Sequence, residues 1–244
     1  MSIRKFLFIT FLFKFIIVCH GKTNLNEKRP NLIFFFPDTL RAESFNSYGN
    51  TVPNLTPNFQ AFGKEGTRFE QAHVMHTQCS PSRCTMMTGR YMHTLGHRTQ
   101  IHLIRAYEEN YFRLLKESGY HVSWYGKNDA LSQAAFNLSV SEWENDIGYD
   151  SGKNTYEFGE SGYWSMLSTG GSKSSNDPTN GDLKAVLKAI EFLNSNPPEP
   201  FVIFLPPRGG HPPYGAPKDF TNKWTIDEIK KHVKLRPSGI KGKP

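Results

Sequence analysis

NLIFFFPD, residues 31–38, sets the architecture of this 244-residue chain. The apolar residues from Leu32 to Phe36 follow one another without a polar break, and Pro37 and Asp38 end the run. An uninterrupted apolar run of this kind is typical of a strand that is covered on both faces, as in parallel sheets. We therefore expect a buried strand that ends at a carboxylate.

Similar apolar runs recur along the chain and alternate with helical patterns. A second buried strand is expected at residues 200–205 (PFVIFL), with further strands at 68–74 and 120–125. Amphipathic spacing, early prolines and terminal glycines predict helices over residues 54–65, 80–90, 108–118 and 182–194. Strands that alternate with helices predict an α/β fold with a largely parallel sheet.

Three polar residues come shortly after the ends of expected strands, namely Asp38, Lys127 and His211. Functional groups of open α/β sheets gather beyond the carboxyl ends of the strands, so we expect these three residues to share one site. Residues 144–179, by contrast, are rich in Gly, Ser and Asn and show no repeat. A long loop or a substrate-facing insertion is expected there.

The net charge of +7 is unevenly distributed along the chain. Residues 1–21 and residues 222–244 are strongly basic, whereas the body between them carries a slight net negative charge. The basic balance therefore describes the two ends of the chain, and it does not indicate a nucleic-acid partner.

The first residues have the pattern of a secretory signal peptide. Arg4 and Lys5 precede an apolar run that reaches Val18, and Gly21 follows. The run is shorter than the ~20 residues that a membrane span needs, and Lys14 interrupts it, so stable membrane insertion is not expected. We expect a secreted or lysosomal protein, and two N-glycosylation triplets, at Asn54 and Asn137, are compatible with export.

Two cysteines remain once the leader is set aside, Cys79 and Cys84. A disulfide between them is one interpretation, because the exported chain would mature in an oxidising compartment. A zinc module is not expected, since no second ligand pair stands at suitable spacing. Pro81 in the first turn and Gly89 at the end of the predicted helix place Cys79 at a helix N-terminus.

CSPSRCTMMTGR, residues 79–90, resembles the signature of the type I sulfatases, in which Cys-x-Pro-x-Arg is followed by a helix that closes in Thr-Gly-Arg. The resemblance implies an alkaline-phosphatase-like domain with a large, mostly parallel sheet flanked by helices. It also implies that a formylglycine-generating enzyme oxidises Cys79 to formylglycine (3-oxoalanine). The hydrated aldehyde would attack the sulfur of a sulfate ester, and its second hydroxyl would then expel sulfate. Arg83, one turn further on, is expected to direct its guanidinium toward that group.

A metal ion is implied by the same resemblance. Asp38 resembles the aspartate that binds calcium in this family, and a carboxylate oxygen is the kind of ligand that Ca²⁺ requires. The modified Cys79 is expected to contact the same ion. Many members carry a second aspartate directly after the first, but here Thr39 follows, so one expected ligand is missing or replaced.

Three further residues are carried over from matching segments. Lys127, in GYHVSWYGKND, resembles the lysine that contacts the substrate sulfate, and His211, in FVIFLPPRGGHPPYGAP, resembles a histidine that contacts the sulfate or the leaving oxygen. Family members commonly have a histidine two positions after that lysine, where this chain has Asp129. Asp129 could act as the base only if its pKa were raised, and otherwise another group such as a histidine would serve.

The expected organisation is a signal peptide at 1–21, the N-terminal part of a sulfatase catalytic domain at 22–221, and a basic tail or the start of a missing remainder at 222–244. Sulfatases are usually about twice this long, so the chain is expected to be a fragment, a truncated gene model or a shortened isoform. The expected activity is hydrolysis of a sulfated carbohydrate or an aryl sulfate. A truncated, inactive binding protein and a different hydrolase of the alkaline-phosphatase superfamily are the alternatives.

Overall fold

The computed structural model describes residues 28–144, 156–160, 163, 176–177, 180–212, 214–221, 223 and 225–232. The expected signal peptide and most of the long segment 144–179 lie outside these residues, as does most of the basic tail. The description below concerns residues 31–244, the second of the two units of the chain. Among the described helices, none has the length and apolar character that crossing a membrane requires.

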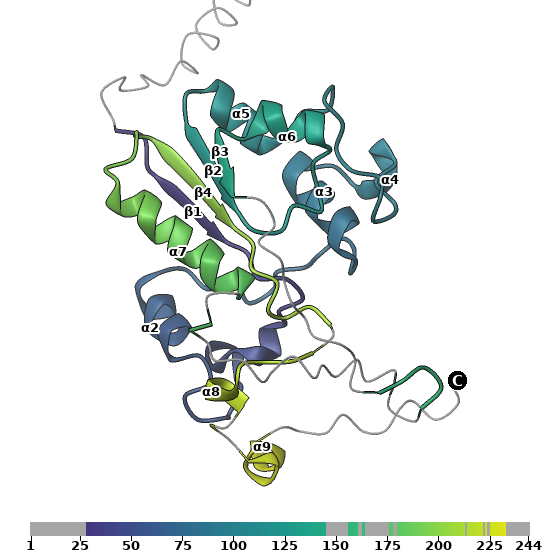
Figure 1. Ribbon diagram of the computed structural model, residues 1–244, viewed down its shortest axis with the longest axis vertical. Coiled ribbons are helices and arrows are strands. Elements are labelled where there is room, and N and C mark those ends of the chain that lie inside the picture. Colours follow the sequence, from purple (N-terminus) through teal and green to yellow (C-terminus); the bar gives the residue numbers. More distant parts are fainter. Residues whose placement is uncertain are drawn as a thin grey trace, which may run out of the picture. The chain divides into compact units, whose positions relative to one another are not determined.

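Within the described residues, four parallel strands form one sheet in the order β1-β4-β2-β3 (Figure 1). Their bounds are Leu32–Phe35 for β1, His121–Tyr125 for β2, Glu142–Glu144 for β3 and Phe201–Leu205 for β4. β4 lies between β1 and β2, with Leu32 opposite Val202 and Val122 opposite the same residue. The mostly parallel sheet expected from the sequence is therefore confirmed.

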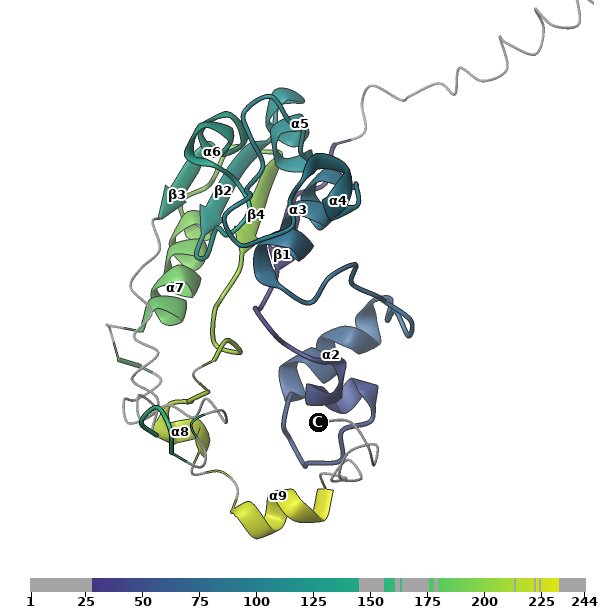
Figure 2. The same ribbon diagram turned by 90° about the vertical axis from the view of Figure 1, so that its right-hand side faces the viewer.

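Successive side chains of the strands point to opposite faces of the sheet, and helices pack against both faces to form two cores. Val202 and Phe204 of β4 face the first core, with Trp124 of β2 and helices α3 (Cys79–Thr88), α5 (Tyr111–Glu117) and α6 (Gln133–Ser139). The other side chains of β4 face α7 (Gly181–Asn194). Figures 1 and 2 show α7 on one side of the sheet and α5 and α6 on the other.

The helices begin where capping side chains satisfy the first free N–H groups. The side chains of Asn110, Ser132 and Asn180 accept hydrogen bonds from backbone N–H groups at the starts of α5, α6 and α7. α2 (Pro57–Glu65) lies between Thr56 and Gly66, and Gly89 ends α3 with a φ of 65°. The remaining helices are short: η1 (Ala42–Ser44), η2 (Asn46–Tyr48), α2 (Pro57–Glu65), α4 (Met92–Leu95), α8 (Lys218–Thr221) and α9 (Ile226–His232).

β1 is not buried as its apolar sequence suggested. Ile33 is 58% exposed, Phe34 37% and Phe35 44%, whereas every residue of β4 is buried. β1 is an edge strand of the described sheet and has a neighbouring strand on one side only. An apolar sequence does not show whether a strand lies at the edge or in the centre of a sheet. The prediction of a strand is correct, and the prediction of its burial is wrong.

The predicted strand at residues 68–74 does not form. Arg68 binds the carboxylate of Glu70 and the carbonyl oxygen of Ser47, while Phe69 and Val74 are 69% and 70% exposed. Alternating side chains can form a strand only where a neighbouring strand offers hydrogen bonds, and none of the described strands lies beside this segment. α6 and β3, in turn, were not predicted.

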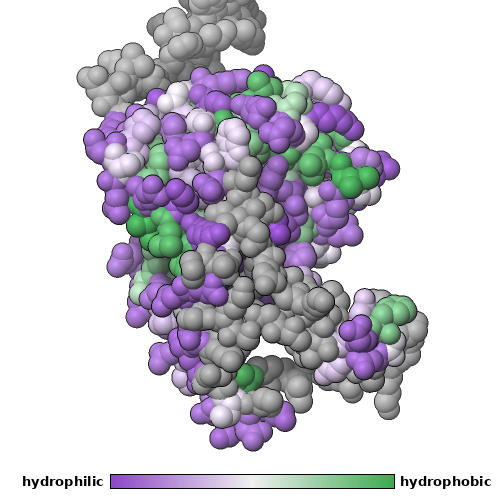
Figure 3. Space-filling model, viewed as in Figure 1, coloured by the Kyte–Doolittle hydropathy of each residue, from purple (hydrophilic) through white to green (hydrophobic). Residues whose placement is uncertain are grey.

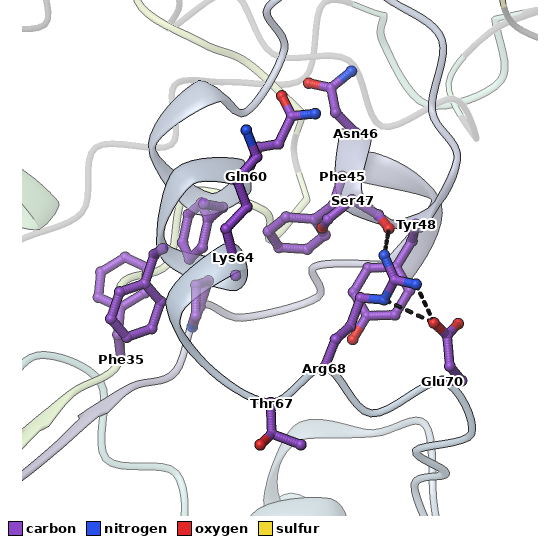
Figure 4. A pocket seen from close by; sticks show the side chains of 14 residues that line it. Phe35, Phe45, Asn46, Ser47, Tyr48, Gln60, Lys64, Thr67, Arg68 and Glu70 are labelled. Atoms are coloured by element: carbon purple, nitrogen blue, oxygen red, sulfur yellow. Dashed lines mark hydrogen bonds and ion pairs between the residues drawn. The ribbon is translucent and has the colours of Figure 1, made fainter.

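Apolar surface is exposed at two places. Figure 4 shows a pocket of about 720 Å³ between the end of β1 and α2, lined by aromatic rings including Phe35, Phe45 and Phe59. On α7, Leu187, Ile190 and Leu193 are exposed, in the region where Figure 3 shows a hydrophobic patch at its left side. The described residues thus leave apolar surface uncovered beside β1 and on α7.

Candidate active site

The carboxyl ends of three strands bring the predicted residues together. Asp38 follows β1, Lys127 follows β2, and His211 lies in the loop after β4. The backbone N–H of Asp38 donates to the carbonyl oxygen of Pro207 at 2.9 Å, which holds the first of these segments against the third. The expectation that Asp38, Lys127 and His211 share a site is borne out in the geometry.

The ammonium group of Lys127 lies at the centre of the cluster. Its Nζ is 2.6 Å from Oδ2 of Asp38, 2.8 Å from Oδ2 of Asp129 and 3.4 Å from Sγ of Cys79. Lys127 is only 5% exposed, so these contacts take the place of water around the charge. The lysine thereby links the ends of β1 and β2 to the start of α3.

The pKa values of Lys127 and Asp38 are shifted in opposite directions. Burial by itself disfavours the charged lysine, but the hydrogen bonds with Asp129 and Asp38 outweigh it, and the pKa of Lys127 is raised above its ordinary value. Burial would likewise raise the pKa of Asp38, but the hydrogen bond from Lys127 and the charges of Lys127 and Arg83 lower it overall. Both residues are therefore charged near neutral pH.

Cys79 is the first residue of α3, and its thiol faces the charged cluster. Sγ lies 3.6 Å from each carboxylate oxygen of Asp38. Cys84 lies on another side of the same helix, in the first core, where its thiol donates to the carbonyl oxygen of Ala130 at 3.6 Å. Both cysteines are free thiols, so the alternative of a disulfide between Cys79 and Cys84 is wrong.

Gln100 fixes the start of α3, a role that the sequence did not reveal. Its Oε1 accepts hydrogen bonds from the backbone N–H of Ser80 at 3.1 Å and from the Ser80 hydroxyl at 2.8 Å. The N-cap residue Gln78 makes no side-chain cap. Gln100, which lies outside the helix, satisfies one of the free N–H groups of the first turn in its place. Cys79 is thus presented on an anchored helix end.

Arg83 is buried beneath the site and points its guanidinium toward it. The side chain is 2% exposed, its Nη2 lies 3.7 Å from Oδ2 of Asp38, and its Cζ lies 5.2 Å from the centre of the Phe36 ring. Burial lowers the pKa of Arg83, while the negative charges of Asp38 and Asp129 raise it. Neither Nη atom has a hydrogen-bond partner among the described residues, although buried donors are normally satisfied. The guanidinium is therefore available to an anion above it.

His211 is placed by a tight loop packed against α7. The side chain of Asp182, in the first turn of α7, accepts a hydrogen bond from the backbone N–H of Arg208 at 2.7 Å. Gly210 lies so close to the carbonyl oxygen of Asp38 that a Cβ atom would clash with it. The loop therefore depends on a residue without a side chain directly before His211. Asp182 and Gly210 were not singled out from the sequence, although the GG pair before His211 was a usable signal.

Asp129 lies two positions after Lys127, where the sequence left the catalytic base uncertain. Its φ of 47° is unusual for a residue with a side chain, and the side chain of Asn128 supports this turn by accepting from the N–H of Leu131 at 2.9 Å. Its carboxylate is 35% exposed and is paired with Lys127. A base role for Asp129 stays a prediction, and the described contact is an ion pair.

The residues around Asp38 provide only part of a calcium site. One ligand atom each from Asp38, Cys79 and His211 lies within 4.8 Å of the others. Ca²⁺ takes 6–8 oxygen ligands, whereas this group offers one carboxylate, one imidazole and one thiol. The carboxylate is also engaged by Lys127. The described residues therefore fit one contribution to a calcium site and do not complete its ligand shell.

The fold and the cluster define an α/β domain in which a parallel sheet carries a polar site at the carboxyl ends of its strands. The family model described as Sulfatase matches residues 30–230. The chain belongs to the sulfatase family.

Individual relatives agree with this assignment. The N-acetylglucosamine-6-O-sulfatase of Bacteroides thetaiotaomicron is 27% identical over 115 residues, which are 47% of this chain and 20% of the relative. The uncharacterized sulfatase YidJ of Escherichia coli is 25% identical over 209 residues, which are 81% of this chain and 41% of the relative. The chain therefore spans less than half the length of these two relatives.

A solved structure supports the fold. The structure of BT4656 in complex with its substrate D-glucosamine-2-N,6-O-disulfate has a TM-score of 0.57 and 24% sequence identity to this chain. The similarity covers 75% of this chain and 35% of that one. The likeness shows a shared fold.

Proposed function

We propose that this chain belongs to an enzyme that hydrolyses the sulfate ester of a carbohydrate, through a formylglycine formed from Cys79. The observation that carries the proposal is the contact of the Cys79 thiol with Asp38 and Lys127, within the segment that matches the sulfatase signature. A sugar substrate is supported by the carbohydrate named for the first relative and by the substrate D-glucosamine-2-N,6-O-disulfate that is bound in the similar structure. The sequence pattern of the leader supports export to the secretory pathway.

An aldehyde at position 79 would supply an oxygen nucleophile once it is hydrated. The aldehyde would form again when its second hydroxyl expels sulfate. Lys127 is positioned to bind one oxygen of the substrate sulfate, because its Nζ lies 3.4 Å from the side chain at position 79. Arg83 adds a second positive charge, and its Nη atoms, which have no hydrogen-bond partner among the described residues, can donate to the same anion. Two cations in a buried site stabilise the negative charge of a sulfuryl group far better than solvent-exposed ones would.

Cleavage of the bond between sulfur and the ester oxygen leaves negative charge on that oxygen. A protonated His211 could give its proton there and release a neutral alcohol. Asp38 would contribute one carboxylate ligand to Ca²⁺, whose chemistry in such a site is to polarise the sulfuryl oxygens.

The modification of Cys79 is tested by the mass of one peptide. Trypsin releases residues 69–83, which contain Cys79 as their only cysteine. We expect the chain, when produced with a formylglycine-generating enzyme, to yield this peptide with an aldehyde in place of the thiol. Recovery of the unmodified thiol or of a disulfide from that system would contradict the proposal and favour a binding protein without catalysis.

The catalytic role of position 79 is tested by substitution. Cys79→Ala should abolish calcium-dependent hydrolysis of a chromogenic aryl sulfate, because no nucleophile can form at an alanine. Cys84→Ala is the matched control: it removes a buried thiol from the same helix and should lower stability by about 1 kcal/mol while activity remains. Equal activity of Cys79→Ala and the unaltered chain would refute the mechanism.

A further inference from the structure

One connecting segment of the chain is bonded to two sides of the proposed active site. Residues 97–108 run from α4 to α5, and both of these helices lie beside α3 (Figure 2). The segment itself contains no helix or strand. It reaches the start of α3, where Cys79 lies, and the turn after β2, where Lys127 lies. We call residues 97–108 the brace.

The first attachment of the brace joins Gln100 to Ser80, the residue after Cys79. Oε1 of Gln100 lies 3.1 Å from the backbone N of Ser80 and 2.8 Å from its hydroxyl oxygen, and the carbonyl oxygen of Gln100 lies 3.2 Å from the same hydroxyl oxygen. Ser80 is completely buried, so these contacts are shielded from solvent. Because the backbone of Gln100 takes part as well as its side chain, the position of the brace fixes the first turn of α3.

The second attachment joins Ile104 to the turn that carries Lys127. The N–H of Ile104 donates to the carbonyl oxygen of Ala130 at 2.8 Å, and the N–H of Ser132 donates to the carbonyl oxygen of Ile104 at 2.9 Å. The Ile104 side chain is fully buried in the first core. Asp129, which pairs with Lys127, directly precedes Ala130. The brace thus contacts both the nucleophile side and the cation side of the site.

A buried pair of polar side chains joins the two ends of the brace. His97 is 1% exposed and Glu108 is 6% exposed. Nδ1 of His97 lies 2.7 Å from the carbonyl oxygen of His102, to which it donates because a carbonyl oxygen only accepts. Nε2 of His97 lies 3.5 Å from Oε2 of Glu108, which also accepts from the backbone N–H of Arg105 at 2.7 Å. These contacts tie the first residue of the brace to its middle and to its last residue.

Stability alone does not explain the burial of this pair. Removing polar or charged side chains from water is costly, and apolar side chains of similar size often stabilise a protein equally well. A loop of this length samples many conformations unless tertiary contacts restrict it. Hydrogen bonds and ion pairs restrict it more closely than apolar contacts do, because they depend on direction as well as distance. The pair is therefore suited to hold the brace in one conformation.

We propose that His97 and Glu108 are positioning residues of the active site, which hold position 79 and Lys127 in a fixed relation through the brace. They act through Gln100, which reaches α3, and through Ile104, which reaches the turn after β2. The catalytic consequence rests on the proposed function. The restraint on the two attachments does not, because it can be measured in a chain that performs no turnover.

The restraint is tested by amide hydrogen exchange of the full chain with a thiol at position 79, measured by NMR. His97→Ala should raise the exchange rates of the Ser80, Ile104 and Ser132 amides about tenfold beyond any rise in β4, because both attachments then open locally. Glu108→Ala should have the same effect. Glu108→Gln should preserve the protection, because its amide oxygen can still accept and its amide nitrogen can donate to Nε2 of His97.

A second pair of histidine and carboxylate supplies the matched control. Nε2 of His121 lies 3.4 Å from Oε2 of Glu142, and His121 begins β2, at the opposite end of that strand from Lys127. His121→Ala should leave exchange at both attachments unchanged. Unchanged exchange in His97→Ala would overturn the proposal. An equal rise in all elements, β4 included, would also overturn it, because the pair would then contribute only general stability.

The catalytic consequence is tested with protein that carries formylglycine. His97→Ala and Gln100→Ala should each lower kcat for an aryl sulfate about tenfold with a smaller change in KM, because displacement by ~1 Å of reacting groups slows the chemical step. The double variant should lose little more than either single variant, since both act through the brace. His121→Ala should retain the kcat of the unaltered chain.

Two kinetic outcomes would contradict a positioning role. One is a kcat of His97→Ala equal to that of His121→Ala, and the other is a double variant whose losses are fully additive. An unaltered chain that carries formylglycine but hydrolyses no sulfate ester would contradict the proposed function instead. The exchange rates would then still decide whether the His97–Glu108 pair holds the brace.

Discussion

Lys127 shows how one side chain can connect three segments of the chain. Its ammonium group contacts Asp38, Asp129 and the thiol of Cys79, and each contact comes from a different element or turn. A buried charge is tolerated only when its donors are satisfied, so the three contacts explain how a lysine can be 5% exposed. A sulfate oxygen that binds Nζ would have to share the N–H donors of Lys127 with Asp38, Asp129 and the side chain at position 79.

The two cysteines of α3 are expected to react differently because their surroundings differ. Burial raises the pKa of Cys84 to about 12, so almost no thiolate forms there at neutral pH, and the side chain is fully inaccessible. Cys79 is partly exposed. In protein made without the formylglycine-generating enzyme, iodoacetamide at about pH 8 should alkylate Cys79 and spare Cys84.

Peptide mass spectrometry measures this difference, and alkylation in denaturant supplies the control. Both cysteines should react once the chain is unfolded, because burial is then lost. Labelling of Cys84 at the rate of Cys79 in the native protein would contradict the described packing of α3.

At the residue scale, the sequence identified most of the cluster but not its supports. Asp38, Cys79, Lys127 and His211 could be found because each stands at the end of a strand or at the start of a helix within a recognisable motif. Gln100 and Asp182 could not, because a side chain that caps a distant backbone group leaves no periodic or spacing signal. The pairing of Asp129 with Lys127 also depends on an unusual φ that the sequence does not specify.

At the scale of elements, the loop after β4 must pass very close to the segment after β1. Gly210 is the point of closest approach, and Gly210→Ala should force the two segments apart. We expect a loss of about 1–3 kcal/mol in the free energy of unfolding, together with displacement of His211. Denaturant unfolding measures the first effect.

Gly63→Ala is the matched control for this substitution. Gly63 lies inside α2, no atom would contact its Cβ within 4 Å, and alanine favours helices over glycine by up to about 1 kcal/mol. The control should therefore be neutral or stabilising. A Gly210→Ala variant as stable as Gly63→Ala would show that the loop does not need this close approach.

The strands were predictable where burial and sequence agree. β2 and β4 are central, and their apolar side chains fill the two cores, so an apolar run is sufficient to identify them. Residues 68–74 have a similar alternation but find no partner strand among the described residues, and β3 has only three residues, too few for a period to be visible. A segment forms a strand only where a partner strand lies beside it, and the sequence of one segment does not show which segment that partner is.

At the scale of the whole molecule, β1 should affect behaviour in solution, because it has no neighbour on one side among the described strands. An exposed edge strand with apolar side chains favours pairing with another chain, and a lysine at such an edge opposes it. We expect concentration-dependent self-association in sedimentation velocity, which Ile33→Lys should reduce. Leu187→Lys, on the exposed face of α7, is the control and should have little effect. An equal effect of both variants would assign the association to apolar surface in general. A protein that stays monomeric at every concentration would show that the β1 edge does not drive self-association.

The order of the strands also affects how the chain can fold during synthesis. β1 pairs with β4, and Asn31 bonds the N–H of Phe201, a partner 170 positions later in the sequence. At ribosomal rates this partner emerges roughly 10–30 s after β1. Pairings of such high contact order form slowly, so the newly made phenylalanines of β1 remain without their partner for that time. Nascent chains of this protein should therefore depend on chaperones that bind short apolar segments.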